Sequence, residues 1–181
     1  MAVLRLFVAL ELPDEVRRRI AMLSAGLPDA RWVAPENLHV TLRFIGEVDE
    51  YVAEDIDSEL VGVRGRPIKI SLDGLGCFES RDRVRAVWAR VVAGEELAHL
   101  QRSIEHAVRR AGLEPDTHKF VPHVTLTRLR RVPVDVVAPY LAHNGDFRAG
   151  PFDVAHFTLF RSHMGHGGSH YEALAQYDLT A

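Results

Sequence analysis

The chain has 181 residues, of which 47% are hydrophobic and 26% are charged, with a formal net charge of −3 at pH 7. This is the ordinary balance of a globular protein, and the chain is long enough to bury a core without disulfide staples. The net charge argues against a protein that coats long nucleic acid, because such binding neutralises many phosphates, but it allows a few local donors to grip a single phosphate at a chain end.

Export and membrane insertion are not expected. Arg5 and Glu11 interrupt the hydrophobic start of the chain, and no small-residue cleavage site follows it. No apolar stretch approaches the roughly 18 residues of a membrane span. The single cysteine, Cys77, excludes an internal disulfide, which suits a reducing compartment. We therefore expect a cytoplasmic protein with no membrane contact, and a monomer as the default state.

The first half of the chain is predicted to alternate strands and helices. The expected elements are a strand at 4–12 buried on both faces, a helix at 13–23, a loop at 26–37, a strand at 38–45 ended by Gly46, and a helix at 50–61. Both helices begin with acidic residues, which favour the positive end of the helix dipole. This pattern is typical of a mixed α and β protein.

The second half continues with longer β segments. The expected elements are strands at 68–75 and 84–92 joined by a charged loop, a helix at 95–111, a strand at 121–129, a short helix at 135–141, and strands at 152–161 and 171–179 joined by a loop at 162–170. The helix at 95–111 is the clearest, because its apolar residues recur at three- and four-residue steps before Gly112.

The order of these elements repeats. A strand, a helix, a strand that carries the letters HVTL, a helical segment and further strands occur once in each half. Leu72 lies 33 residues after His39, and His156 lies 33 residues after His123. We therefore predict two related α+β lobes with antiparallel-leaning sheets, which bring the two HVTL strands together near a pseudo-two-fold axis.

The HVTL strands carry the candidate chemistry. Residues two apart on a strand share a face, so His39 and Thr41 point one way while Val40 and Leu42 enter a core. The same argument pairs His123 with Thr125. Two imidazoles can serve as general base and general acid in phosphodiester hydrolysis, because the pKa of histidine lies near neutrality. The threonine hydroxyls can donate hydrogen bonds to phosphate oxygens.

It is the pair of motifs that indicates this function, because a lone H-x-T is a weak signal among ten histidines. A third near-copy, His156-Phe157-Thr158-Leu159, occupies the repeat position of Leu72, so we expect a structural strand there. Most of the basic residues at 81–85 and 128–131 are expected to be solvated charge. The histidines His163, His166 and His170 fit a solvated loop better than a lid or an adventitious metal site.

The sequence resembles the 2H phosphoesterase superfamily, and within it the RNA 2′,3′-cyclic phosphodiesterases, also called 2′-5′ RNA ligase-like proteins. The resemblance covers nearly the whole chain: the two HVTL motifs, Arg5-Leu6-Phe7-Val8-Ala9-Leu10, the stretch 31–39, Pro122 before the second motif and Thr127-Arg128 after it, the stretch 157–162, and Tyr171-Glu172. It implies a single bilobal α+β domain over 1–181, with two pseudo-symmetric, mostly antiparallel sheets, outer helices and a central cleft.

The resemblance also implies an activity and roles. The activity is hydrolysis of RNA 2′,3′-cyclic phosphate ends, or of small cyclic nucleotides, to 2′-phosphomonoesters without metal or cofactor. His39 is implied as the proton donor and His123 as the proton acceptor, with Thr41 and Thr125 on the phosphate. Arg128 matches an arginine often found after the second motif, although regular strand parity would turn it away from the cleft unless a bulge redirects it. Arg43 has the right parity and is the second candidate for binding phosphate.

Three alternatives remain open. The same acid–base pair can run the reverse reaction and join RNA ends through a 2′-5′ bond, and sequence cannot separate the two directions. A non-catalytic module that binds RNA ends or nucleotides would leave both histidine–threonine pairs unexplained. A metal enzyme is disfavoured, because H-x-T-x has no nearby carboxylate or thiolate to complete a coordination sphere. Phe7, Trp32, Phe44 and Tyr51 are candidates to stack on a nucleoside, although aromatic residues at such positions more often belong to the core.

Overall fold

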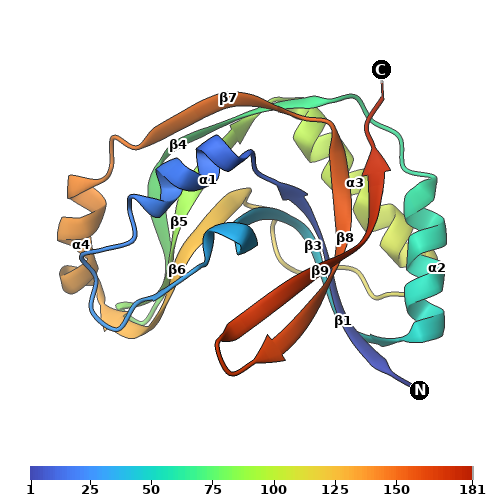
Figure 1. Cartoon of the computed structure of the whole chain (residues 1–181), viewed down its shortest axis with the longest axis horizontal. Coiled ribbons are helices and arrows are strands. Elements are labelled where there is room, and N and C mark those ends of the chain that lie inside the picture. The colour runs from blue at the N-terminus through green and yellow to red at the C-terminus, as the bar shows by residue number, and fades with distance from the viewer. Residues whose placement is uncertain (181) are drawn as a thin grey trace.

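The computed structural model describes residues 1–180 and shows an α+β protein (Figure 1). The strands are β1 (Val3–Glu11), β2 (Arg31–Trp32), β3 (His39–Asp49), β4 (Ile68–Ser80), β5 (Arg83–Ala93), β6 (His123–Pro133), β7 (Arg148–Val154), β8 (His156–Gly165) and β9 (Gly168–Asp178). The helices are α1 (Asp14–Ala21), the short 3-10 helix η1 (Pro35–Asn37), α2 (Glu50–Val61), α3 (Glu95–Arg110) and α4 (Val134–His143). The predicted α+β class is confirmed.

The strands form one antiparallel sheet in the order β7-β4-β5-β6-β3-β1-β8-β9, with β2 paired to β6. Its two halves meet where β3 and β6 run antiparallel, with Val40 opposite Val124. The two HVTL strands are therefore neighbours at the centre, as the repeat predicted. The two expected sheets are joined at this short contact into one continuous sheet.

The repeat has a spatial counterpart. The first half runs in the order β1, α1, β3, α2 and β4. The second half runs in the order β5, α3, β6, α4, β7 and β8. β4 pairs with β5 of the second half, whereas β8 returns to pair with β1 of the first. Each half therefore contributes a strand to the other. His156 begins β8, between β1 and β9, which agrees with its predicted place outside the HVTL pair.

The main hydrophobic core lies between the sheet and the helices. Figure 1 shows α2 beside α3 at one end of the molecule and α4 at the other. A second, small cluster of Phe7, Ala9 and Phe160 is joined by Tyr171 and is separate from the main core. The expectation that β1 is buried on both faces is confirmed, because every residue from Leu6 to Leu10 is at most 5% exposed.

Two predicted loops are instead the ends of long hairpins. β4 and β5 extend to a two-residue turn, Arg81-Asp82, whose φ values are 53° and 60°. Two residues with positive φ match the twist of a tight hairpin, but such pairs are usually Asn-Gly or Asp-Gly, so the residue types at 81 and 82 do not indicate this turn. β8 and β9 likewise extend through most of 162–170, and the hairpin projects from the body in Figure 1. Its mostly polar tip lacks the hydrophobic alternation that marks a half-buried strand.

Three further boundaries need correction. Gly46 does not end β3: it has a φ of 90° and lies at a register shift against β1, so it bends the strand, which continues to Asp49. The strand expected at 152–161 is divided at Ala155 into β7 and β8, which lie at different ends of the sheet. The loop expected at 26–37 contains β2 and η1. No helix within residues 1–180 is long and apolar enough to cross a membrane.

Candidate active site

The HVTL strands separate their residues between two faces as predicted. Val40, Leu42, Val124 and Leu126 are at most 2% exposed in the main core. The intervening residues His39, Thr41, His123 and Thr125 line one cavity of about 300 Å³, together with Val33, Asn37, Phe44, Phe78, Ala86, Arg128 and Tyr171. We call this cavity the motif cleft. Two imidazoles and two hydroxyls from adjacent strands therefore face a common space.

Both imidazoles are oriented in the same way. Nδ1 of His39 donates a hydrogen bond to the carbonyl of Asn37 at 2.6 Å, and Nδ1 of His123 donates to the carbonyl of Val121 at 2.6 Å. A carbonyl can only accept, so the proton of each neutral ring is on Nδ1 and the lone pair is on Nε2. Nε2 of His39 accepts a hydrogen bond from the Thr41 hydroxyl at 2.9 Å.

Aromatic side chains surround each imidazole. His39 lies against Phe7 and Tyr171, with ring centroids 4.9 and 5.4 Å away. His123 lies against Phe78 and Trp88, at 4.9 and 5.7 Å. These rings exclude water and restrict the tilt of the imidazoles, which a positioned acid or base requires.

The electrostatics of the cleft favour neutral imidazoles. The pKa of His39 is lowered from 6.5 to about 4, chiefly because burial disfavours the charged form; the hydrogen bond to Asn37 opposes this shift, and the charge of Arg128 adds to it. The pKa of His123 is also lowered, first by burial, against the effect of its bond to Val121 and with that of Arg128. Arg128 therefore acts on both rings.

A bulge in each motif strand decides where the neighbouring arginines point. In the ladder of β1 and β3, Val8 pairs with Arg43 but Ala9 pairs with Thr41, so Leu42 is an extra residue. In the ladder of β5 and β6 the shift falls at Leu126. After each extra residue the parity is reversed. Arg128 consequently lines the motif cleft, and its position agrees with the bulge that the sequence argument required.

The same bulge turns Arg43 toward the interior. Its side chain is 8% exposed and pairs with Glu105 of α3. Its two terminal nitrogens donate to the carbonyls of Phe44 and Glu114, each at 2.6 Å. Arg43 therefore does not line the motif cleft, for which the sequence made it the second candidate to bind phosphate, but lines a cavity of about 420 Å³ beside it.

Sequence reasoning missed several residues of the site, namely Tyr171, Phe78 and Trp88, because they come from strands far from the motifs. One signal was available for Trp88. A Cβ on Gly76 would lie 2.4 Å from the indole, so this glycine leaves room for the ring that backs His123. Of the four aromatic residues suggested by the sequence, Phe44 lines the cleft and Phe7 contacts His39, whereas Trp32 packs against Tyr140 and Tyr51 is exposed on α2.

The histidines of the β8–β9 hairpin lie on strands and its turn. His163 faces His170 across the ladder and contacts Glu172 at 2.7 Å, while the Asn37 amide donates to the carbonyl of Ser169. The latter bond ties the hairpin to the segment before His39. Within residues 1–180, no group of three or more His, Cys, Asp or Glu side chains is arranged to hold a metal ion.

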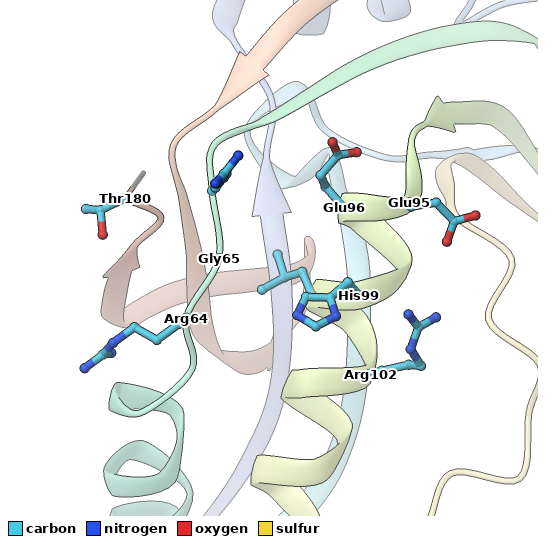
Figure 2. A pocket seen from close by; sticks show the side chains of 9 residues that line it. Arg64, Gly65, Glu95, Glu96, His99, Arg102 and Thr180 are labelled. Carbon is cyan, nitrogen blue, oxygen red and sulfur yellow. The ribbon is translucent and has the colours of Figure 1, made fainter.

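A cavity of about 610 Å³ lies elsewhere, between the segment after α2 and the first turns of α3 (Figure 2). In Figure 2 the guanidinium groups of Arg64 and Arg102 lie far apart and point in different directions, and Glu95 and Glu96 project from the start of α3. These side chains do not converge as an anion or catalytic site would require. We therefore place the candidate active site in the motif cleft, although this cavity is the smaller of the two.

The fold and the paired H-x-T strands are those of a 2H phosphoesterase. The family model of the 2′-5′ RNA ligase superfamily matches residues 12–166, and the chain belongs to this family. An RNA 2′,3′-cyclic phosphodiesterase of Aeropyrum pernix is 36% identical over 87% of this chain and 90% of its own. An RNA 2′,3′-cyclic phosphodiesterase of Archaeoglobus fulgidus is 32% identical over 97% of this chain and 100% of its own. The crystal structure of E. coli LigT complexed with 3′-AMP is 28% identical, with a TM-score of 0.81 over 99% of this chain and 100% of that one.

Proposed function

We propose that this chain hydrolyses RNA 2′,3′-cyclic phosphate ends to 2′-phosphomonoesters by acid–base catalysis between His39 and His123, without a metal. The observation that carries the proposal is the common orientation of the two imidazoles. A carbonyl holds Nδ1 of each ring, and both rings line the cleft that Arg128 also lines. The relatives named RNA 2′,3′-cyclic phosphodiesterase support the choice of substrate.

The proposed reaction needs one neutral and one protonated imidazole. Nε2 of His123 takes a proton from water as the water oxygen attacks phosphorus. The bond between phosphorus and O3′ breaks, and O3′ receives the proton from Nε2 of His39. The phosphate stays on O2′. At the end His123 is protonated and His39 is neutral, so proton exchange with solvent restores the starting state.

The other residues of the cleft stabilise charge. Thr41 and Thr125 can donate hydroxyl hydrogen bonds to the non-bridging phosphate oxygens, and Arg128 adds a positive charge. The phosphodiester anion in turn favours a protonated imidazole, because an opposite charge nearby raises a histidine pKa. Substrate binding would thus offset the effect of burial and supply the acid that the reaction requires.

Joining of RNA ends through a 2′-5′ bond is a second candidate, favoured by the name of the family, the 2′-5′ RNA ligase superfamily. In that reaction a 5′-hydroxyl takes the place of water: its oxygen attacks phosphorus and gives its proton to one histidine, the bond between phosphorus and O3′ breaks, and O3′ receives a proton from the other, so the cleft supports both reactions. Product analysis separates them: incubation of a cyclic-phosphate oligonucleotide with a second oligonucleotide that carries a 5′-hydroxyl gives a longer, 2′-5′-linked strand if ligation prevails. A module that only binds RNA ends would give neither product.

The decisive experiment measures hydrolysis of a 2′,3′-cyclic-phosphate oligonucleotide in EDTA. His39→Ala and His123→Ala should each lower kcat by about a hundredfold or more, the usual worth of a positioned acid or base. His156→Ala is the matched control, since it removes the histidine of the third H-x-T motif, which does not line the motif cleft. Full activity in either cleft variant, or a loss confined to His156→Ala in folded protein, would refute the proposal.

A further inference from the structure

The segment before His39 is attached to a distant strand. Asn37 is the last residue of the short helix η1, and its backbone carbonyl accepts the hydrogen bond from Nδ1 of His39 at 2.6 Å. Its side-chain amide donates a hydrogen bond to the backbone carbonyl of Ser169 at 2.8 Å, on β9 and 132 residues away in the sequence. A single residue therefore connects the imidazole of His39 to the β8–β9 hairpin.

The helix η1 cannot by itself fix the direction of the Asn37 carbonyl. It is a single 3-10 turn of three residues. Such turns have poorer hydrogen-bond geometry than an α-helix, and the carbonyls at the end of a helix have no partner within it. The carbonyl of Asn37 is one of these groups, so contacts outside the turn must hold it. The bond from the Asn37 amide to β9 is such a contact.

The hairpin also contacts the imidazole directly. Tyr171, two residues after Ser169 on β9, packs against His39 with ring centroids 5.4 Å apart. Tyr171 packs against Phe7 as well, at 4.9 Å, and Phe7 lies 4.9 Å from His39. The hairpin therefore restricts the ring of His39 directly through Tyr171 and at its Nδ1 edge through Asn37. A proton donor needs a fixed orientation of this kind.

The second half of the molecule has no equivalent attachment. The residue two positions before His123 is Val121, whose carbonyl accepts the bond from Nδ1 at the same distance of 2.6 Å. Its side chain is 41% exposed, and a valine side chain has no hydrogen-bond donor. The difference agrees with the proposed roles, because a general base must meet water, whereas a general acid must deliver its proton to one leaving oxygen.

From these contacts we propose that Asn37 is a positioning residue, whose amide attaches the segment before His39 to β9 and thereby fixes the orientation of the acid. Without this attachment the bond from Nδ1 of His39 loosens, the ring samples further rotamers, and its proton is shared between Nδ1 and Nε2. The β8–β9 hairpin thus acts on the reaction without taking part in proton transfer. The inference rests on the proposed function, because it takes His39 as the proton donor.

The kinetic test uses adenosine 2′,3′-cyclic monophosphate. Asn37→Ala should lower kcat by about tenfold and leave KM nearly unchanged, because Thr41 and Arg128 still face the phosphate while the acid is no longer held. Asn37→Gln keeps a side-chain amide and should recover part of the loss. On bis(4-nitrophenyl) phosphate, whose nitrophenolate departs without a proton, Asn37→Ala should match wild type.

The matched control is Asn144→Ala. Asn144 is the other asparagine of the chain, and its amide also donates to a backbone carbonyl, that of Tyr140, at 3.0 Å. This bond lies at the end of α4 and outside the motif cleft. Asn144→Ala removes the same kind of hydrogen bond and should leave the rates on both substrates unchanged.

A spectroscopic measurement tests the attachment without catalysis. In ¹⁵N NMR spectra at a pH where both rings are neutral, His39 should carry its proton on Nδ1 in the wild type. In Asn37→Ala it should show a mixture of both tautomers, while His123 stays unchanged. If this result holds but His39→Ala retains full hydrolysis, the proposed function fails and the attachment stands.

Three outcomes would overturn the inference. The first is an unchanged His39 spectrum in folded Asn37→Ala, or a wild-type proton on Nε2, which can be measured even if that variant does not fold. The second is an equal loss on both substrates, since Asn37 also lines the motif cleft and would then act on the substrate or on the fold. The third is a loss in Asn37→Gln as large as that in Asn37→Ala, because the amide would then not be the group that holds the segment.

Discussion

His39 on β3 and His123 on β6 stand on the same backbone frame. In each half a threonine follows two residues later, a bulge comes next, and the second residue after the bulge returns to the cleft. The frame then presents different side chains at that last position, Phe44 in one half and Arg128 in the other. The comparison teaches that a duplicated backbone can keep the geometry of two imidazoles while its side chains make the cleft asymmetric.

The side chains behind the imidazoles differ as well. Thr41 pairs with Ala9 across the ladder, whereas Thr125 pairs with Trp88. His39 is the more deeply buried ring, between Phe7 and Tyr171, and its pKa is lowered to about 4. Burial between Phe78 and Trp88 also lowers the pKa of His123, so both environments favour a neutral imidazole in the free protein.

The lowered pKa of His39 sets a requirement on the proposed roles. It makes the ring neutral in the free protein near pH 7, yet the proposed reaction uses His39 as the proton donor. The bound phosphodiester must therefore raise the pKa of His39 strongly. Burial makes this physically reasonable, because a charge–charge interaction strengthens as the surrounding dielectric constant falls. The assignment of His39 as the acid and His123 as the base is therefore the part of the comparison that an experiment can test most directly.

The largest expected effect is the loss of activity when either cleft histidine is removed, and a change of leaving group separates the roles of the two. On a cyclic-phosphate substrate, His39→Ala and His123→Ala should each lose about a hundredfold or more in kcat. On bis(4-nitrophenyl) phosphate, whose nitrophenolate departs without a proton, His39→Ala should come within severalfold of wild type, while His123→Ala should keep its full loss. Release of nitrophenolate measures both rates. Rescue of His123→Ala in place of His39→Ala would reverse the proposed roles.

Arg128→Gln should give the next largest effect, a loss of about ten- to a hundredfold in kcat/KM, since a charged hydrogen-bond donor to phosphate is removed. It should also move the pH profile. The positive charge of Arg128 lowers the pKa of both histidines, so its removal raises both, and both limbs of the kcat/KM profile shift to higher pH. Because the pKa of each histidine is lowered from 6.5, the optimum of kcat/KM for the wild type should lie below pH 6.5.

Arg130→Gln is the control for this experiment, because Arg130 lies on the same strand but is exposed and does not line the motif cleft. It should change neither the rate nor the profile. An unshifted profile in Arg128→Gln, or a wild-type optimum of kcat/KM above pH 7, would mean that the electrostatic account of the cleft is wrong.

The pairing of the two motifs could be predicted because it depends on rules that a strand cannot escape. Strand parity placed His39 and Thr41 on one face, and the repeat placed the two HVTL strands side by side. The ends of α2 agreed with its helical pattern and its acidic start. These features are local or repeated, so a single sequence carries them.

Other features depend on contacts between distant parts of the chain. Nothing in Leu42 or Leu126 marks a bulge, since both are ordinary core leucines, yet the bulges decide where Arg43 and Arg128 point. Tyr171 reaches the cleft only because β8 and β9 return to the edge of β1. The ends of both long hairpins were predicted as loops, because Arg81-Asp82 is not a usual turn pair and the tip of β8 and β9 lacks a hydrophobic alternation. Tertiary pairing supplied this information.

The smallest effect on activity is expected where the two halves differ behind the bulges. Arg43 and Thr127 hold equivalent interior positions, but Thr127 is a neutral side chain whose hydroxyl donates to a nearby carbonyl, whereas Arg43 needs the carboxylate of Glu105. Glu105→Gln leaves a buried guanidinium without its counter-charge, which should lower the free energy of unfolding by on the order of 3 kcal/mol. Hydrolysis of ethylene phosphate, a five-membered cyclic phosphodiester without a base, should stay within about twofold of wild type in the folded variant, because Glu105 does not line the motif cleft.

Glu59→Gln provides the matched comparison. Glu59 makes the same contact with an arginine Nε, that of Arg110, but the two side chains are 36% and 55% exposed, against 16% and 8% for Glu105 and Arg43. An exposed pair contributes less than about 1 kcal/mol, so denaturant unfolding should separate the two variants clearly. Equal midpoints would show that the interior position of Arg43 tolerates an unpaired charge. The ion pair would then not be needed to stabilise the bulged strand β3. The two halves would differ only in the side chains that line the cleft.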